Sequence, residues 1–257
     1  MSIVVFLIIL FVLVLVHEFG HFWMAKSFNI KVDEFGFGFP PKLFGIKKGE
    51  TEYTFNLLPI GGFVKIFGEN PNEENTNGPD SARSFVNKPK YKQAIVLLAG
   101  VFANFLLAFI LFSAVLMLGT AKMSLYPAVL KGMKVTLFIT KNTVLGLYTL
   151  IVDGLQGKGS LESITGPVGL VGMIGSAYKS GFTYLLSFTA LISVNLTIIN
   201  LLPFPALDGG RLFFLLIEKI NGSRINPKIT NTANIVGFCI LIFIMLLVTY
   251  HDVVKLF

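Results

Sequence analysis

Long apolar runs separated by shorter polar segments dominate the sequence. Residues 3–16 are all aliphatic or aromatic, and the apolar character resumes at 22–25. A stretch of that total length suffices for a helix that crosses the hydrocarbon layer of a membrane. Similar runs occupy residues 91–118, 181–202 and 235–250. The pattern therefore predicts a polytopic α-helical membrane protein with about four transmembrane helices.

The polar region between the first two runs, residues 27–90, has a different pattern. Short apolar stretches at 42–46, 51–57 and 63–67 alternate with glycine, proline and charged turn residues, which is typical of strands in hairpins. We predict a small cytoplasmic-side, membrane-associated β-sheet, followed by an unpatterned, solvated polar loop at 69–84. Such a sheet would either offer a free edge to an extended peptide or merely close the cytoplasmic mouth of the protein.

The segment between the second and third runs carries lysines spaced among apolar residues, which favours an amphipathic helix on the outer surface of the membrane. Residues 135–155 are apolar enough that a further span stays an alternative. The predicted parts are the first transmembrane helix at 1–26, the β-hairpin and polar loop at 27–90, the second helix at 91–118, the outer amphipathic segment at 119–180, the third helix at 181–211, and an interface segment with the fourth helix at 212–257.

Composition agrees with a membrane protein and narrows the candidate chemistry. Hydrophobic residues make up 54% of the chain and charged residues only 14%, with a mean hydropathy of +0.75. The net charge of +7 comes from basic residues in loops beside apolar runs, without the clustered stripe that nucleic acids require, so we expect no nucleic-acid partner. The single cysteine, Cys239, excludes a thiolate metal cluster, so metal ligands must be His, Asp or Glu.

The charges around the first helix predict how it crosses the membrane. No Lys or Arg precedes it, whereas Lys26 and Lys31 follow closely. The positive-inside rule then puts the N-terminus outside and the end of the helix toward the cytoplasm. The first 25 residues lack the basic start and the cleavage site of a signal peptide, so we expect the helix to be retained.

The end of this first helix carries the candidate chemistry, His17-Glu18-Phe19-Gly20-His21. On a helix, His17 and His21 lie one turn apart on a single face, where two imidazoles can bind one metal ion while Glu18 stands beside them. Glu18 would then be the general base toward a water molecule whose pKa the zinc lowers. A chance occurrence is disfavoured, because each ionisable side chain in a spanning helix costs on the order of a few kcal/mol unless it is paired or bound.

A third zinc ligand is needed, and Asp208 is the best candidate. It follows the third run, which returns to the cytoplasmic side, and it comes directly after Pro203 and Pro205, which must break the helix. His251 would lie on the opposite side of the membrane, and Glu69 belongs to the solvated loop. The alternative for Asp208 is that its carboxylate only caps the following short helix.

Taken together, the motifs resemble the site-2 protease family of intramembrane zinc metalloproteases, and most closely its RseP-like branch, typified by the regulator of sigma-E protease. The resemblance rests on the His17 to His21 motif in a first span and on the run from Asn200 to Gly209 near the third. Residues 53–66 also resemble the membrane-re-entrant β-loop of that branch.

This resemblance implies a function and a set of site residues. The ligands of Zn²⁺ would be His17, His21 and Asp208, and Glu18 would be the catalytic glutamate. Substrates would be single-span membrane proteins, such as anti-sigma factors or residual signal peptides, cut within their transmembrane segments in the bacterial inner membrane. Substrate contacts would come from the third span and its broken end, at Asn195, Asn200, Pro203 and Pro205.

Two departures from the branch are visible, and two other functions stay open. The segment at 119–165 is too short for the PDZ domain that members carry, and Val101 stands where the family motif Gly-Pro-x-x-Asn has proline, although Gly100 and Asn104 are kept. Asn104 itself is more typical of an interhelical hydrogen bond than of a catalytic contact. The alternatives are a metal transporter that uses the same three ligands, although the halves of the chain show no repeat, and an inactive scaffold for partner helices. The sequence does not predict the oligomeric state.

Overall fold

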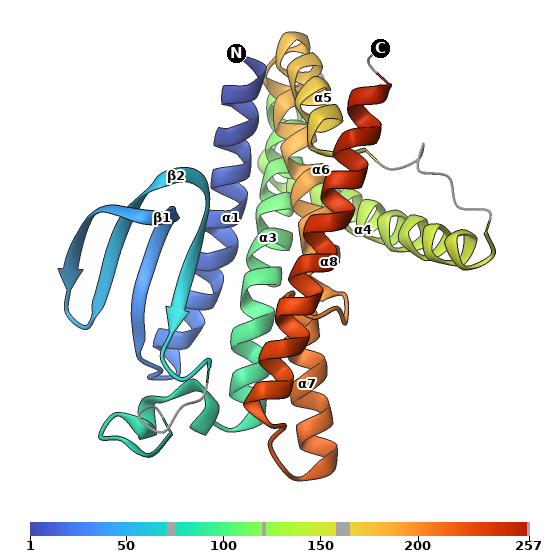
Figure 1. Ribbon diagram of the computed structural model, residues 1–257. Coiled ribbons are helices and arrows are strands. Elements are labelled where there is room, and N and C mark those ends of the chain that lie inside the picture. The colour runs from blue at the N-terminus through green and yellow to red at the C-terminus, as the bar shows by residue number, and fades with distance from the viewer. Residues whose placement is uncertain (71–75, 120–121, 158–164, 256–257) are drawn as a thin grey trace. The chain divides into compact units, whose positions relative to one another are not determined.

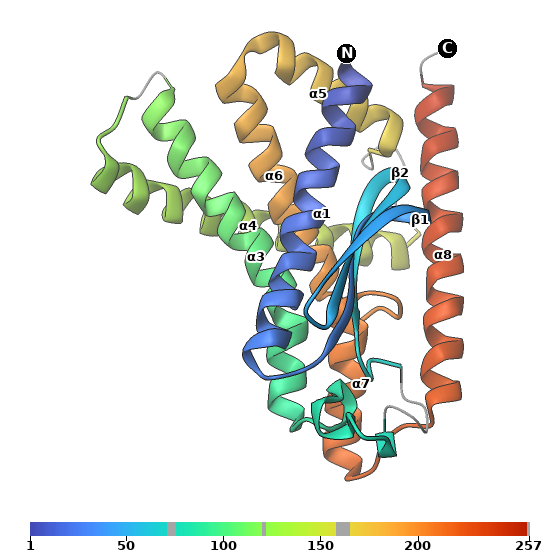
Figure 2. The same cartoon turned by 90° about the vertical axis from the view of Figure 1, so that its left-hand side faces the viewer.

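The computed structural model is mostly helical and describes residues 1–70, 76–119, 122–157 and 165–255. Part of the polar loop predicted at 69–84 lies outside these residues. Five of the helices are long and apolar enough to cross a membrane, with bounds Ser2–Ser27 (α1), Lys90–Leu118 (α3), Leu125–Leu155 (α4), Phe182–Leu201 (α6) and Pro227–Val254 (α8). The prediction of a polytopic helical membrane protein with a small sheet is confirmed. Helix α4, which contains residues 135–155, is a further candidate span by length and composition only, and it lies across the direction of α6 in the first unit, as a helix on the membrane surface would (Figure 1 and Figure 2).

The remaining elements are shorter. They are two strands, Val32–Lys48 (β1) and Thr51–Ile66 (β2), two 3-10 turns, Ser81–Arg83 (η1) and Phe85–Asn87 (η2), and two helices, Pro167–Ser180 (α5) and Asp208–Asn221 (α7). The chain divides into two compact units. The first contains residues 1–6, 105–199 and 237–257, and the second contains residues 7–104 and 200–236.

The second unit contains the sheet, which lies beside α1 (Figure 1). The two strands pair antiparallel and both bend, so the first part of β1 is flanked on both sides by β2. Residues 34–37 pair with 62–65 on one side and with 52–55 on the other. In this register the residues of 62–66 each have a partner on one side only, so that this segment forms an edge of the sheet. Phe22 of α1 packs edge-on against Phe35, which joins the sheet to the helix.

A buried apolar cluster holds the second unit together. Its members come from the end of α1 and the turn after it, both strands, η2 and α3, namely Ala25, Ile30, Val32, Ile66, Phe85, Val96 and Leu97. Several large apolar side chains of the sheet are exposed instead, among them Leu43, Phe44 and Ile46. Exposed apolar strands suit a sheet that contacts lipid, as the sequence predicted.

The first unit is built on a second cluster in which α4 takes part. Ala108 and Phe112 of α3 pack with residues of α6, and Val135, Ile139 and Leu147 of α4 pack against them. Helix α5 leads through a sharp turn at Gly181 into α6 (Figure 2). The carboxylate of Asp252 on α8 accepts hydrogen bonds from the backbone N–H groups of Gly166 and Gly169, at 3.2 and 2.8 Å, and so satisfies donors at the start of α5.

Candidate metal centre and catalytic site

The metal-binding motif lies on α1 as the sequence predicted. The side chains of His17 and His21 are one turn apart, and both residues are buried, with 8% and 7% of their surfaces exposed. Their Nε2 atoms are 3.1 Å apart and point to the same spot. Two imidazoles buried this deeply in an apolar helix need a shared partner.

Asp208 supplies that partner from a break in the chain. Helix α6 ends at Leu201 and α7 begins at Asp208, so the prolines interrupt the helix where the sequence predicted. Ala206 in this break adopts a left-handed conformation, with a φ of 76°, and its N–H donates to the side chain of Asn234 at 3.1 Å. A side chain at Gly209 or Gly210 would overlap backbone carbonyl groups of the residues just before α7. The two glycines therefore let the first turn of α7 pack directly against the break.

The break aims the carboxylate of Asp208 at the two histidines. Its Oδ2 atom lies 3.0 Å from His17 Nε2 and 3.3 Å from His21 Nε2. The residue before it, Leu207, is the N-cap of α7 and makes no side-chain capping bond. Asp208 is thus the first residue inside α7 rather than its N-cap, and these distances show that its carboxylate faces the imidazoles.

The three atoms have the spacing that zinc requires. In a tetrahedral site with bonds of about 2.0 Å, neighbouring ligand atoms lie roughly 3.3 Å apart. The triangle formed by the two Nε2 atoms and Asp208 Oδ2 has edges of 3.0, 3.1 and 3.3 Å. Among the residues that the structure describes, His17, His21 and Asp208 are the group able to hold a metal ion. The donor set of two imidazoles and one carboxylate suits zinc.

The Nδ1 atoms of both histidines, which point away from the candidate metal position, also have polar neighbours. His21 Nδ1 lies 2.8 Å from the carbonyl oxygen of Val96, so this nitrogen donates and Nε2 keeps its lone pair for a metal. The amide of Asn104, which is fully buried, approaches His17 Nδ1 to 3.5 Å. The amide atom nearest the ring is Nδ2, and a half turn of the amide would instead place its oxygen there as an acceptor. In that orientation Nδ1 donates and Nε2 of His17 is likewise free to bind a metal.

Asn104 and Gly100 are the functional positions whose role sequence reasoning underestimated. Asn104 does bridge two helices, but its partner is the candidate ligand His17 rather than an ordinary packing contact. A Cβ atom at Gly100 would overlap the rings of both histidines, so this glycine makes room for them. The family-like spacing of Gly100 and Asn104 was the signal that could have indicated both roles.

Glu18 is half-buried beside the ligands, and its carboxylate accepts a hydrogen bond from the backbone N–H of Val64. Val64 belongs to the edge segment 62–66 of the sheet. The sheet therefore contacts the candidate base directly, which the strand pattern alone did not predict.

The candidate substrate contacts are only partly gathered. Asn200 and Pro205 are half-buried, and Pro203 is exposed, in the same unit as the metal centre. Asn195 belongs to the other unit, in the middle of α6. The assignment of these four residues to substrate contacts stays a prediction.

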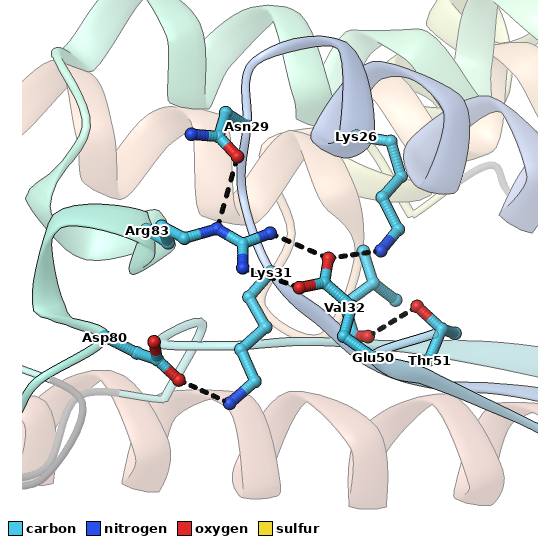
Figure 3. Close-up of polar contacts among 8 residues, drawn as sticks. All are labelled: Lys26, Asn29, Lys31, Val32, Glu50, Thr51, Asp80 and Arg83. Carbon is cyan, nitrogen blue, oxygen red and sulfur yellow. Dashed lines mark hydrogen bonds and ion pairs between the residues drawn. The ribbon is translucent and has the colours of Figure 1, made fainter. Parts of the chain in front are cut away.

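Two acidic residues outside the centre have unexpected partners. Glu69, which the sequence assigned to a solvated loop, is in fact paired with Arg211 of α7, and its side chain is only 19% exposed. Glu50 in the turn between the strands binds Arg83 through two bonds of 2.5 and 2.7 Å and Lys26 at 2.5 Å (Figure 3). These bonds lower the pKa of Glu50 to about 2. They join the tip of the hairpin to the end of α1.

Comparison with known proteins matches residues 5–244 to the model of Peptidase family M50. A Clostridium perfringens relative, named as a zinc metalloprotease, is 32% identical over 94% of this chain and 95% of its own. The zinc metalloprotease RasP of Geobacillus kaustophilus is 25% identical over 100% and 98% of the two chains. The regulator of sigma-W protease RasP of Bacillus subtilis is 25% identical over 100% of this chain and 99% of its own.

These matches decide between the functions that the sequence left open, and favour the protease over the transporter and the scaffold. They also agree with the resemblance in the motifs and with the zinc-like spacing of the site. The alignment with the Bacillus protein runs over 421 positions, so it leaves long gaps opposite the 257 residues of this chain. The chain belongs to Peptidase family M50, the site-2 protease family, and is a zinc-dependent intramembrane metalloprotease of the multi-pass membrane type.

Proposed function

We propose that His17, His21 and Asp208 hold the zinc ion and that Glu18 is the catalytic base. The observation that carries this proposal is the triangle of two Nε2 atoms and one carboxylate oxygen with edges of 3.0 to 3.3 Å. Zinc held there would supply Lewis-acid activation of a water molecule and of the scissile carbonyl group.

The chain's own residues account for the proton transfers of hydrolysis. Glu18 accepts a proton from the attacking water as the water oxygen bonds to the carbonyl carbon. It then donates this proton to the amide nitrogen as the C–N bond breaks, which leaves a new carboxyl end and a new amino end. The N–H of Val64 orients Glu18 for both steps.

The substrates proposed are transmembrane segments of single-span proteins, such as anti-sigma factors or residual signal peptides. The candidate ligands on α1 lie in a helix long and apolar enough to cross a membrane. A peptide bond in a helix is shielded by its own turn, so the substrate must unwind before it is cut. The break at Pro203 and Pro205 would give the unwound segment a place to lie, and in the sequence Asn195 and Asn200 belong to the helix that leads into this break.

The protein would reside in the bacterial inner membrane with its N-terminus outside and its metal centre toward the cytoplasm. Lys26 in the last turn of α1 and Lys31 after the helix support this orientation. The segment at 119–180 would stand in place of the PDZ domain that the resemblance implies between the second and third predicted spans.

The test uses the purified protein in liposomes with a single-span substrate that has helix-breaking residues in its span. Glu18→Gln should keep about one zinc per chain and lose cleavage by at least 10³-fold, because removal of the general base leaves binding intact. Asp208→Ala should lose zinc as well as activity. Undiminished cleavage by Glu18→Gln would refute the assigned role of Glu18.

A further inference from the structure

The ion pair between Arg211 and Glu69 joins two parts of the chain that are far apart in sequence. Nη1 of Arg211 contacts Oε1 of Glu69, and the side chains are 33% and 19% exposed. Pairs that are partly removed from water are screened less than pairs on an open surface. This contact therefore joins its two elements through a pair that is only partly screened by water.

Arg211 occupies a fixed place relative to a metal ligand. It follows Asp208 by three residues in α7, so both side chains lie on the same side of the helix. The turn that carries them cannot shift easily, because Gly209 and Gly210 pack against carbonyl groups of the preceding break. A contact that fixes the guanidinium group therefore also helps to fix the position of Asp208.

Glu69 occupies a fixed place relative to the catalytic base. It comes three residues after the end of β2, and its backbone N–H donates to the carbonyl of Ile66 at 3.2 Å. The same stretch of β2 contains Val64, whose N–H donates to Glu18. The edge segment 62–66 is therefore bonded to Glu69 at its C-terminal end, and it contacts Glu18 through Val64.

The charges of the centre also act on Arg211. Burial lowers the pKa of its guanidinium group, and the negative charge of Glu18 opposes that shift. The guanidinium group remains protonated, as arginine does in proteins. It thus lies within electrostatic range of the catalytic carboxylate while it binds Glu69.

We propose that Arg211 and Glu69 are positioning residues that fix the edge segment of the sheet against α7, so that Glu18 and Asp208 keep their places relative to each other. This inference rests on the proposed function of Glu18 and Asp208. The pair touches neither the metal nor the substrate in this role, and acts through Val64 on one side and through the first turn of α7 on the other.

The pair makes a testable kinetic prediction. Arg211→Gln and Glu69→Gln should each lower kcat about 10- to 100-fold, as loss of a supporting partner typically does, with zinc content unchanged. Because the two residues act as one unit, the double variant should be no slower than the slower single variant. Arg211→Lys keeps the positive charge and should recover a large part of kcat.

A matched control exists on the same helix. Lys90 of α3 pairs with Glu218 of α7, which lies two helical turns after Arg211 and so further along the helix from Asp208. Glu218→Gln should lower the thermal unfolding temperature without changing kcat. An equal loss of kcat in Glu218→Gln, multiplicative losses in the double variant, or zinc loss in Arg211→Gln would each overturn the inference. Should Arg211→Gln fail to fold, Glu69→Gln provides the same comparison. A wild-type protein that binds zinc and cleaves no transmembrane substrate would instead refute the proposed function.

Discussion

The contacts of Glu50 predict that this exposed turn contributes measurably to stability. Glu50 lies in the turn between the two strands, and its carboxylate joins Lys26 at the end of α1 to Arg83 of η1 (Figure 3). Arg83 is held in turn by Asn29, whose side-chain oxygen accepts from Nε at 3.2 Å. Replacement of Glu50 by Gln removes the negative charge at the centre of this network and leaves the shape of the side chain nearly unchanged.

The lowered pKa sets the size of the effect. The pKa of Glu50 falls from 4.5 to about 2. Each pKa unit corresponds to about 1.4 kcal/mol, so complete transfer of this shift into stability would give roughly 3.4 kcal/mol. The side chain is 30% exposed, and exposed pairs each contribute only about 0.2–1 kcal/mol after screening. We therefore expect Glu50→Gln to lower the free energy of unfolding by about 1–2 kcal/mol at pH 7.

The pH dependence has a definite sign. The folded-state pKa lies below the unfolded-state pKa, so the stabilisation is complete above about pH 4.5 and is lost as the pH falls toward 2. Equilibrium unfolding in mixed detergent micelles, measured at pH 7 and near pH 2, should show a gap between wild type and variant that closes at the lower pH.

Glu52 on the same hairpin is the matched control. It pairs with Lys42, but both side chains are at least 40% exposed. Glu52→Gln should therefore change the free energy of unfolding by less than about 0.5 kcal/mol. Equal losses in the two variants, or a Glu50→Gln gap that persists unchanged near pH 2, would contradict the reasoning.

Two further predictions concern the surroundings of the histidines. Asn104→Ala removes the amide beside His17 Nδ1 and should weaken zinc affinity about 10- to 100-fold, measured by competition with a zinc chelator, while Asn104→Asp retains an acceptor and should weaken it less. Gly100→Ala places a methyl group where the rings of His17 and His21 lie, and should reduce zinc content and cleavage together; full zinc binding by this variant would show that the rings have more room than the structure indicates.

Some residues of the site can be predicted from their near neighbours in the sequence. They are the residues one helical turn apart in the first helix and the residue that follows the proline break. The pair of histidines with Glu18 follows from helical spacing alone, and Asp208 follows from membrane topology and the neighbouring prolines. Both inferences needed only short-range geometry and the rule that charged groups in a membrane require partners.

The partners of these residues were not predictable in the same way. Asn104 is 87 positions from His17, and Arg211 is separated from Glu69 by most of the chain. Nothing in a single sequence sets which amide or which cation meets which acceptor across such distances. The double flanking of β1 by β2 was missed for a related reason, because a strand pattern specifies alternation along one strand but not the number of neighbours that the strand acquires.

The long-range contacts nevertheless share one physical cause, and it explains why they gather around the sheet. The three side chains of the metal triangle come from two helices, α1 and α7, that are far apart in the sequence. Each has contacts in the sheet or next to it. Helix α1 is joined through Lys26 to Glu50 in the turn between the strands and through Glu18 to Val64, and α7 is joined through Arg211 to Glu69, three residues after the end of β2. By the proposal made above, these contacts set the distance between α1 and α7, so residues that do not touch the metal would determine the geometry of the candidate zinc site.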